Sequence, residues 1–347
     1  MEKLRTRDIG YDFIRCTAMM LIVVYHFVTT FDTTLGWGGS IIFYKQLMCR
    51  HALSFGAIGV CLFFMLSGAV LLMTSKDNIK LKDFYKKRLL KISIPQWISF
   101  TISLVAIYTI DKNILHTNVF GIIISFLGLN YCGKPWNHLG IHSTPWITGE
   151  WFTAVIIYLY LLFPLLKYLF KKARLITTIV ISLIFLVNLK LQILSGCEGW
   201  FSISNGLMAF WAGMLFQEYK QYIPHPLIIG CGIICLITFI MNPSNILGVD
   251  YTKQLICFIF SVLLFAVLYN FKISNPFTKY VSKYNYEIYL VHHRIFILFF
   301  PALISIKTTN VQIIFAFLVL TGMVFLVAEF IQKISNKVLT LFLPQTI

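Results

Sequence analysis

An arginine and a histidine stand in the first long apolar run of the sequence, residues 10–28. Arg15 and His26 are eleven positions apart, which is close to three full turns of an α-helix. A helix over this run places both side chains on one face, about 16 Å apart along its axis. Ionisable residues are costly inside a membrane and are usually functional there. The pair therefore indicates an anion-binding guanidinium near the membrane edge and a proton-transfer imidazole deeper inside.

A structural interpretation of this pair also exists. The arginine would extend its charge to lipid headgroups, and the histidine would hydrogen-bond to a neighbouring helix. Taken alone, the pair leaves both interpretations open.

A basic block, KKRLLK at residues 86–91, stands just before Pro95 at the start of another apolar run. Lys87, Arg88 and Lys91 provide charge-assisted hydrogen-bond donors that suit phosphate groups. Such a block is also a common anchor that sets membrane topology. Arg15 is expected to open from the same side of the membrane, so that Arg15 and the block could bind one anionic ligand together.

Two further polar positions lie in apolar surroundings. Glu150 precedes Trp151 and is expected at the outer interface, where it is either solvated or able to orient a substrate. His292 follows Asn285 and Tyr289 at a spacing of i, i+4 and i+7, which is one stripe of a helix. The pair Ser67 and Gly68 lacks the GxSxG pattern of a nucleophilic serine, and favours close helix packing instead.

The composition excludes a soluble protein. The 347 residues are 58% hydrophobic and 12% charged, with a mean hydropathy of +0.80, whereas soluble domains are about a quarter charged. No polar stretch is long enough to form its own core, so we expect a single membrane domain over residues 1–347 and no appended soluble domain. The net charge of +16 lies in short segments between apolar runs, which is the positive-inside pattern and does not indicate nucleic-acid binding. The eight cysteines show no metal-ligand spacing, so no metal is expected.

These patterns predict an all-α integral membrane bundle of about ten transmembrane helices, with both termini cytoplasmic. The patch at residues 119–129 is too short to cross, and the charge pattern on either side also requires that it does not. The polar segment 131–148 is then outside, beside Glu150. The expected spans are residues 10–28, 56–74, 94–110, 150–166, 175–191, 203–216, 227–241, 255–269, 287–304 and 311–331.

Five motifs, in this order, resemble the blocks of the acyltransferase type 3 family of polytopic membrane enzymes. The first resembles the family's opening helix, in which a basic residue precedes a histidine by eleven. The others resemble its GVD-FF-LSG block, its Arg-x-x-Arg block before a proline, its Trp…Tyr-Leu-Leu-Phe-Pro block and its late SYxIYLxH block. The sequences are YDFIRCTAMMLIVVYH, GVCLFFMLSG, FYKKRLLKISIP, WFTAVIIYLYLLFP and YNYEIYLVHH.

The chain departs from the family pattern at a few positions. Cys61 stands where an aspartate is usual, Lys91 replaces an arginine, and Asn285 replaces a serine. Ile156 and Ile157 stand where many members carry one or two glutamates. The missing glutamates bear on acceptor specificity more than on the transfer chemistry.

The resemblance implies transfer of an acyl group, commonly acetyl, from cytoplasmic acetyl-CoA to a hydroxyl of a sugar, glycan or polysaccharide of the cell envelope. The expected partners are acyl-CoA, the glycan acceptor and the lipid bilayer of the plasma membrane. Arg15, Lys87, Arg88 and Lys91 are expected to bind the donor phosphates. His26 is the expected base, or the site of a transient acyl-histidine, and His292 or Glu150 would orient the acceptor or move its proton.

Two other classes of function remain open from the sequence. A transporter of a glycan or lipid-linked substrate also places charges inside the membrane, but it favours broken helices in matching halves. A non-catalytic sensor or scaffold needs no register between Arg15 and His26. Consumption of acetyl-CoA by the purified protein distinguishes the enzyme from both.

Overall fold

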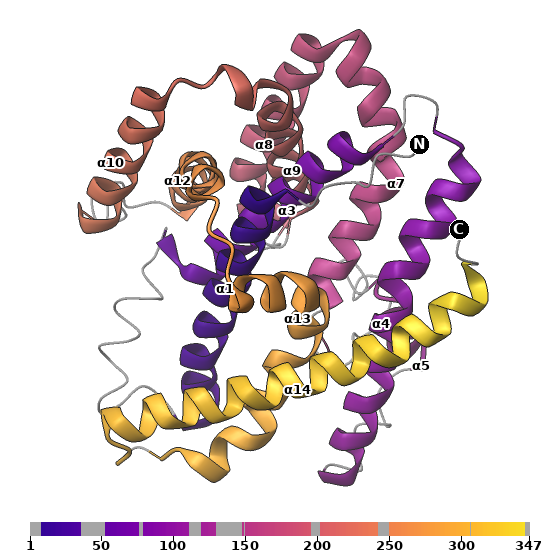
Figure 1. The fold of residues 1–347 in the computed structure, drawn as a ribbon, viewed down its shortest axis with the longest axis vertical. Coiled ribbons are helices and arrows are strands. Elements are labelled where there is room, and N and C mark those ends of the chain that lie inside the picture. The colour runs from indigo at the N-terminus through magenta and orange to yellow at the C-terminus, as the bar shows by residue number, and fades with distance from the viewer. Residues whose placement is uncertain are drawn as a thin grey trace.

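The computed structural model describes residues 8–35, 53–75, 79–110, 119–129, 148, 150–195, 202–241, 250–305 and 307–343 (Figure 1). Within these ranges the chain is helical and forms no β-strand. The short 3₁₀ helix η4 (Lys220–Tyr222) joins two of the α-helices. In chain order the α-helices are α1 (Ile9–Leu35), α3 (Phe55–Thr74), α4 (Leu81–Ile110), α5 (Val119–Phe126), α7 (Glu150–Lys172), α8 (Arg174–Ser195), α9 (Ile203–Tyr219), α10 (His225–Met241), α12 (Asp250–Phe271), α13 (Pro276–Leu303) and α14 (Asn310–Phe342).

Six helices in the described part of the chain are long and apolar enough to cross a membrane, namely α1, α3, α4, α7, α12 and α14. Shorter apolar helices lie within α8 and α10. The expected fold class, an all-α multi-pass membrane bundle, is confirmed. The number of crossings and the cytoplasmic position of both termini stay predictions.

Several helices extend beyond the expected spans. Helix α4 begins at Leu81 instead of residue 94, so the basic block lies on a helix and not in a loop. Helix α13 begins at Pro276 instead of residue 287, and α14 continues to Phe342. Hydropathy marks only the apolar part of a helix, whereas Lys, Arg, Gln and Leu all favour helix formation. The charged ends therefore continue the same helices.

Helix α3 is the most completely buried of the six apolar helices. Two glycines allow it to touch α9 at the backbone. A Cβ at Gly68 would lie 2.0 Å from the carbonyl oxygen of Phe210, and a Cβ at Gly213 would lie 1.8 Å from that of Met65. The expected close packing at Gly68 is confirmed. In contrast, α10 lies at the edge of the molecule, and α14 crosses in front of α13 and α4, both of which it contacts (Figure 1).

A polar cluster joins three helix ends that the charge pattern assigns to the cytoplasm. The ammonium of Lys220, just after α9, lies 3.2 Å from Asp8 Oδ2 at the start of α1. Lys220 also donates to the hydroxyl of Tyr269 near the end of α12, at 2.6 Å. The structure therefore gathers these three ends on one side of the bundle. Arg15 opens from the same end of α1.

The short helix α5 covers most of the patch at residues 119–129. Its eight residues rise about 12 Å, which is too short for a hydrocarbon core of about 30 Å. The ring of Phe126 stacks on Trp97 of α4 at 5.6 Å, and Gln96 donates to the carbonyl of Ser125. The patch thus packs along α4. Apart from Thr148, the segment 131–148 lies outside the described residues.

Candidate active site

Helices α1 and α13 run side by side in the same direction and carry the central polar groups. At one end, Arg15 Nη1 donates to Ser282 Oγ at 3.0 Å. Further along, the ring of His26 lies 5.0 Å from that of His292 and 4.9 Å from that of His293, centroid to centroid. Arg15 and His26 therefore face the same partner helix, three turns apart, as one helical face requires.

The surroundings of His292 determine where its proton lies. Its Nδ1 is 2.8 Å from the carbonyl oxygen of Tyr289 and 3.1 Å from that of Ile288. A carbonyl only accepts, so the neutral ring carries its hydrogen on Nδ1 and a lone pair on Nε2. The residue is 1% exposed, and its Nε2 has no hydrogen-bond partner among the described residues. The buried lone pair therefore lies on a ring whose centroid is 5.0 Å from that of His26.

His293 was not among the site residues expected from the sequence. Adjacent helical residues point about 100° apart, so the stripe that contains His292 does not include His293. In the structure His26 contacts both rings, because its own ring lies over the surface of α13 that the two histidines share. The signal in the sequence was the pair of consecutive histidines inside an apolar run.

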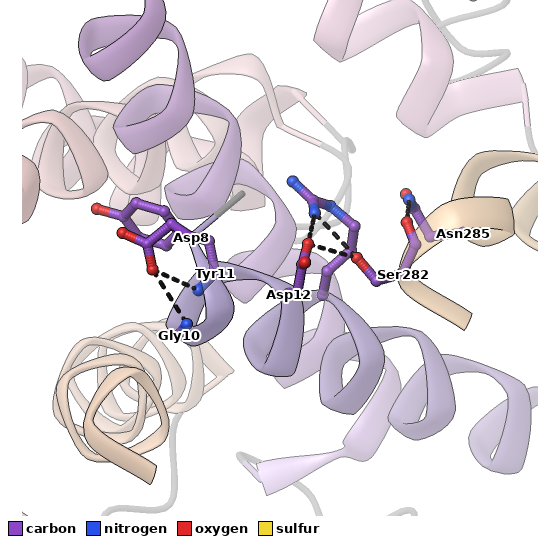
Figure 2. Close-up of polar contacts among 7 residues, drawn as sticks. Asp8, Gly10, Tyr11, Asp12, Ser282 and Asn285 are labelled. Atoms are coloured by element: carbon purple, nitrogen blue, oxygen red, sulfur yellow. Dashed lines mark hydrogen bonds and ion pairs between the residues drawn. The ribbon is translucent and has the colours of Figure 1, made fainter. Parts of the chain in front are cut away.

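Arg15 is held by a network on the predicted cytoplasmic side, whose members Asp12, Ser282 and Asn285 are labelled in Figure 2. Its Nη1 lies 2.6 Å from Asp12 Oδ1, one turn earlier on the same helix. Ser282 Oγ also donates to this oxygen, at 2.7 Å, and Asn285 donates to the carbonyl of Ser282 at 2.6 Å. Asp12 and Ser282 therefore restrict the rotamer of Arg15. The role of Asp12 was missed because its contact with Ser282 spans 270 positions of sequence.

The basic block lies beyond α13 on the neighbouring helix α4. Tyr286 of α13, one turn after Ser282, donates to the carbonyl of Ile92 at 3.2 Å. Arg88 Nη2 donates to Thr74 Oγ1 at the end of α3, at 3.3 Å, while Lys87 and Lys91 are exposed. The structure thus brings Arg15 and the basic block to the neighbourhood of one turn of α13.

Glu150 is the first residue of α7, and its side chain lies outside the described residues. The residues that follow it on α7 contact α13. The ring of Phe152 lies 4.8 Å from that of Tyr289, one turn before His292. Thr153 Oγ1 lies 3.3 Å from the hydroxyl of Tyr286. The start of α7 therefore approaches α13 close to the histidines.

A comparison with known protein families identifies the chain. The family model described as an acyltransferase domain matches residues 8–329, nearly the whole chain. The chain belongs to the acyltransferase type 3 family. No curated protein and no solved structure matches it. The expected family is confirmed, and the protein is a membrane acyltransferase.

Family membership supports the acyltransferase over a transporter without acyl-transfer chemistry. The departures from the family pattern can also be placed. Cys61 is buried on α3, and Ile156 and Ile157 are buried on α7. Within the described ranges, no group of three or more His, Cys, Asp or Glu side chains is arranged to hold a metal ion. The neighbouring histidines of α1 and α13 therefore do not form such a group.

Proposed function

We propose that this acyltransferase transfers an acetyl group from acetyl-CoA to a hydroxyl of a sugar, glycan or polysaccharide acceptor at the plasma membrane. The observation that carries the proposal is the position of His26. Its ring contacts two further histidines of α13, three turns along α1 from an arginine held by Asp12 and Ser282.

The donor phosphates bind on the predicted cytoplasmic side, at Arg15 and the basic block. Arginine pairs with phosphate through parallel charge-assisted hydrogen bonds, and lysine contributes a point charge. Arg88 is partly buried and held by Thr74, whereas Lys87 and Lys91 extend from α4. The three turns of α1 between Arg15 and His26 span about 16 Å. The extended thiol-bearing arm of acetyl-CoA can lie along this part of α1.

At His26 the neutral imidazole acts as a general base. It takes the proton of the acceptor hydroxyl while the oxygen forms a bond to the thioester carbonyl carbon. The tetrahedral intermediate then collapses, the carbon–sulfur bond breaks, and the thiolate receives the proton. The acetyl ester and the free thiol are the products. A transient acyl-histidine at His26 is the second route. Incubation with labelled donor and no acceptor would reveal it, because the label would remain on the protein.

We assign to His292 and His293 the role of positioning the proton that His26 carries. Because its Nδ1 is held by backbone carbonyls, His292 offers Nε2 as an acceptor. An N–H of His26 directed to it would leave the other nitrogen of His26 basic toward the acceptor. Glu150, at the start of α7, is proposed to orient the acceptor.

The test is turnover of acetyl-CoA by the purified protein and by the variant His26→Gln. A general base contributes about 10²–10⁴-fold, so the variant should lose activity by that factor while remaining folded in detergent. The matched control is His225→Gln, because His225 is exposed at the start of α10. That variant should turn over like the parent. Near-normal turnover of His26→Gln would refute the assignment of His26.

A further inference from the structure

A second basic site lies away from the histidines, where α7 ends, α8 begins and α9 ends. These helix ends enclose an open groove of about 500 Å³. Lys171, Lys172 and Arg174 line it together with apolar side chains, among them Phe170 and Leu175. The groove is therefore amphipathic, with cationic and apolar walls side by side.

Arg174 is held in place within this groove. Its guanidinium lies over the ring of Phe170 at 4.4 Å, and Nη1 donates to the hydroxyl of Tyr219 at 2.7 Å. Nη2 forms an ion pair with Glu218 at 2.9 Å. Glu218 is the only acidic residue in the segments 151–180 and 212–222 that form the groove. The described residues that line the groove include three basic side chains and no acidic one, so together with Glu218 they carry a net positive charge.

The apolar wall continues into a surface that faces lipid. Leu175 is 74% exposed, Ile176 is 66% exposed, and Tyr168 of α7 is 60% exposed. In a membrane protein such exposed apolar side chains contact acyl chains. The groove thus lies at the boundary between chains and headgroups, on the side that the positive-inside pattern assigns to the cytoplasm.

We propose that this groove binds an anionic phospholipid. The phosphate is bound by Lys171 and Lys172 beside the ordered Arg174, and the acyl chains lie along Leu175 and Ile176. Basic pockets between helices on the cytoplasmic side attract anionic headgroups, which the negative leaflet supplies at high local concentration. The inference does not depend on the acyl-transfer mechanism, because the groove is formed by α7, α8 and α9, whereas Arg15 and His26 face α13.

The experiment is native mass spectrometry of the full-length protein in detergent, titrated with phosphatidylglycerol or with neutral phosphatidylcholine. The variant carries Lys171→Gln and Lys172→Gln. The control carries the same charge change at exposed Lys272→Gln and Lys337→Gln. Each basic residue near the surface contributes enough that losing two should weaken phosphatidylglycerol binding roughly 30-fold. The control should bind as the parent does, and phosphatidylcholine should not be retained by any of the three.

Two further arms identify the source of the phosphate. Inorganic phosphate and acetyl-CoA are added as competitors to the phosphatidylglycerol complex. Retention of the lipid against both supports a lipid site. Displacement by acetyl-CoA would assign the groove to the nucleotide donor and overturn the proposal. Equal binding of phosphatidylglycerol by the groove variant and the control, with both folded, would also overturn it.

Discussion

At the scale of single residues, the cationic side chains differ in how far their charge is already compensated. Arg15 pairs with Asp12 at 2.6 Å, so a phosphate that binds there must share the guanidinium with a carboxylate. Arg88 donates only to the neutral hydroxyl of Thr74, and no carboxylate in the described part of the chain pairs with it. Arg88 is therefore expected to contribute more long-range attraction to a donor phosphate, and Arg15 more directional hydrogen bonding.

This difference predicts the behaviour of the basic block. Arg88→Ala and Lys91→Ala should each weaken binding of acetyl-CoA by roughly tenfold at low salt, because a charge-assisted hydrogen bond contributes about 1.5 kcal/mol. The loss should shrink as salt rises, since added ions screen the phosphate contacts of the parent. Isothermal titration with the donor across a salt series measures this. The control Lys82→Ala removes an exposed charge from the first turn of the same helix.

If the affinity for acetyl-CoA is unchanged in Arg88→Ala and Lys91→Ala, the block serves only as a topology anchor. The same conclusion would follow if Lys82→Ala weakened donor binding as strongly as they do. Only a loss confined to Arg88 and Lys91 supports a phosphate site at this turn of α4.

At the scale of elements, the packing of α3 against α9 depends on glycine at positions 68 and 213. A Cβ at Gly213 would overlap the backbone of Met65, which cannot move aside as a flexible side chain would. At Gly322 of α14 a Cβ meets nothing within 4 Å. Gly213 and Gly322 both lie within helices, so substitution by alanine adds helix propensity at each position. The two substitutions differ only in the contacts that the new Cβ makes.

We therefore expect Gly213→Ala to destabilise the protein by about 1–3 kcal/mol, the usual range for overpacking. Gly322→Ala should be neutral or should stabilise by up to about 1 kcal/mol, because alanine favours a helix over glycine. Thermal unfolding of the two variants in detergent measures the difference. A midpoint of Gly213→Ala at or above that of the parent would show that α3 and α9 do not approach so closely.

At the scale of the whole molecule, the helix directions agree with a chain that alternates across the membrane. Helix α1 runs antiparallel to α3, where Gly59 lies against Ala18 and Ile22 while Gly56 lies against Tyr25. It runs parallel to α13. These are the relations that the predicted topology requires, in which the three helices are the first, second and ninth crossings. The eight residues of α5 are too few to cross a membrane between the predicted third and fourth spans.

The topology predicts that residue 137 is outside and residue 172 is cytoplasmic. Single cysteines, Asn137→Cys and Lys172→Cys, are placed in a background without other reactive thiols. An impermeant thiol reagent added to intact cells should label the first and spare the second. Asn137 lies outside the described residues, so this prediction rests on the parity of crossings and on the positive-inside pattern. Equal labelling at both positions would contradict the topology.

Much of the architecture follows from local sequence. Apolar runs of about twenty residues must form helices in a bilayer, because no water is present to satisfy the backbone. The spacing of Arg15 and His26 places them on one face by the geometry of a single helix. The order of the five motifs was enough to identify the family, which the match over residues 8–329 confirms. Each of these inferences uses contacts or periodicity within a short stretch.

Only the tertiary structure decided what these faces meet. The contact of His26 with both His292 and His293, and of Asp12 with Ser282, joins helices that are far apart in the chain. Helix periodicity specifies which side chains share a face, but not which helix packs against that face. That choice depends on the sum of many weak packing contacts over the whole bundle. The sequence by itself therefore determined the helices, the family and the candidate base, and the packing of α1 on α13 determined the groups that surround it.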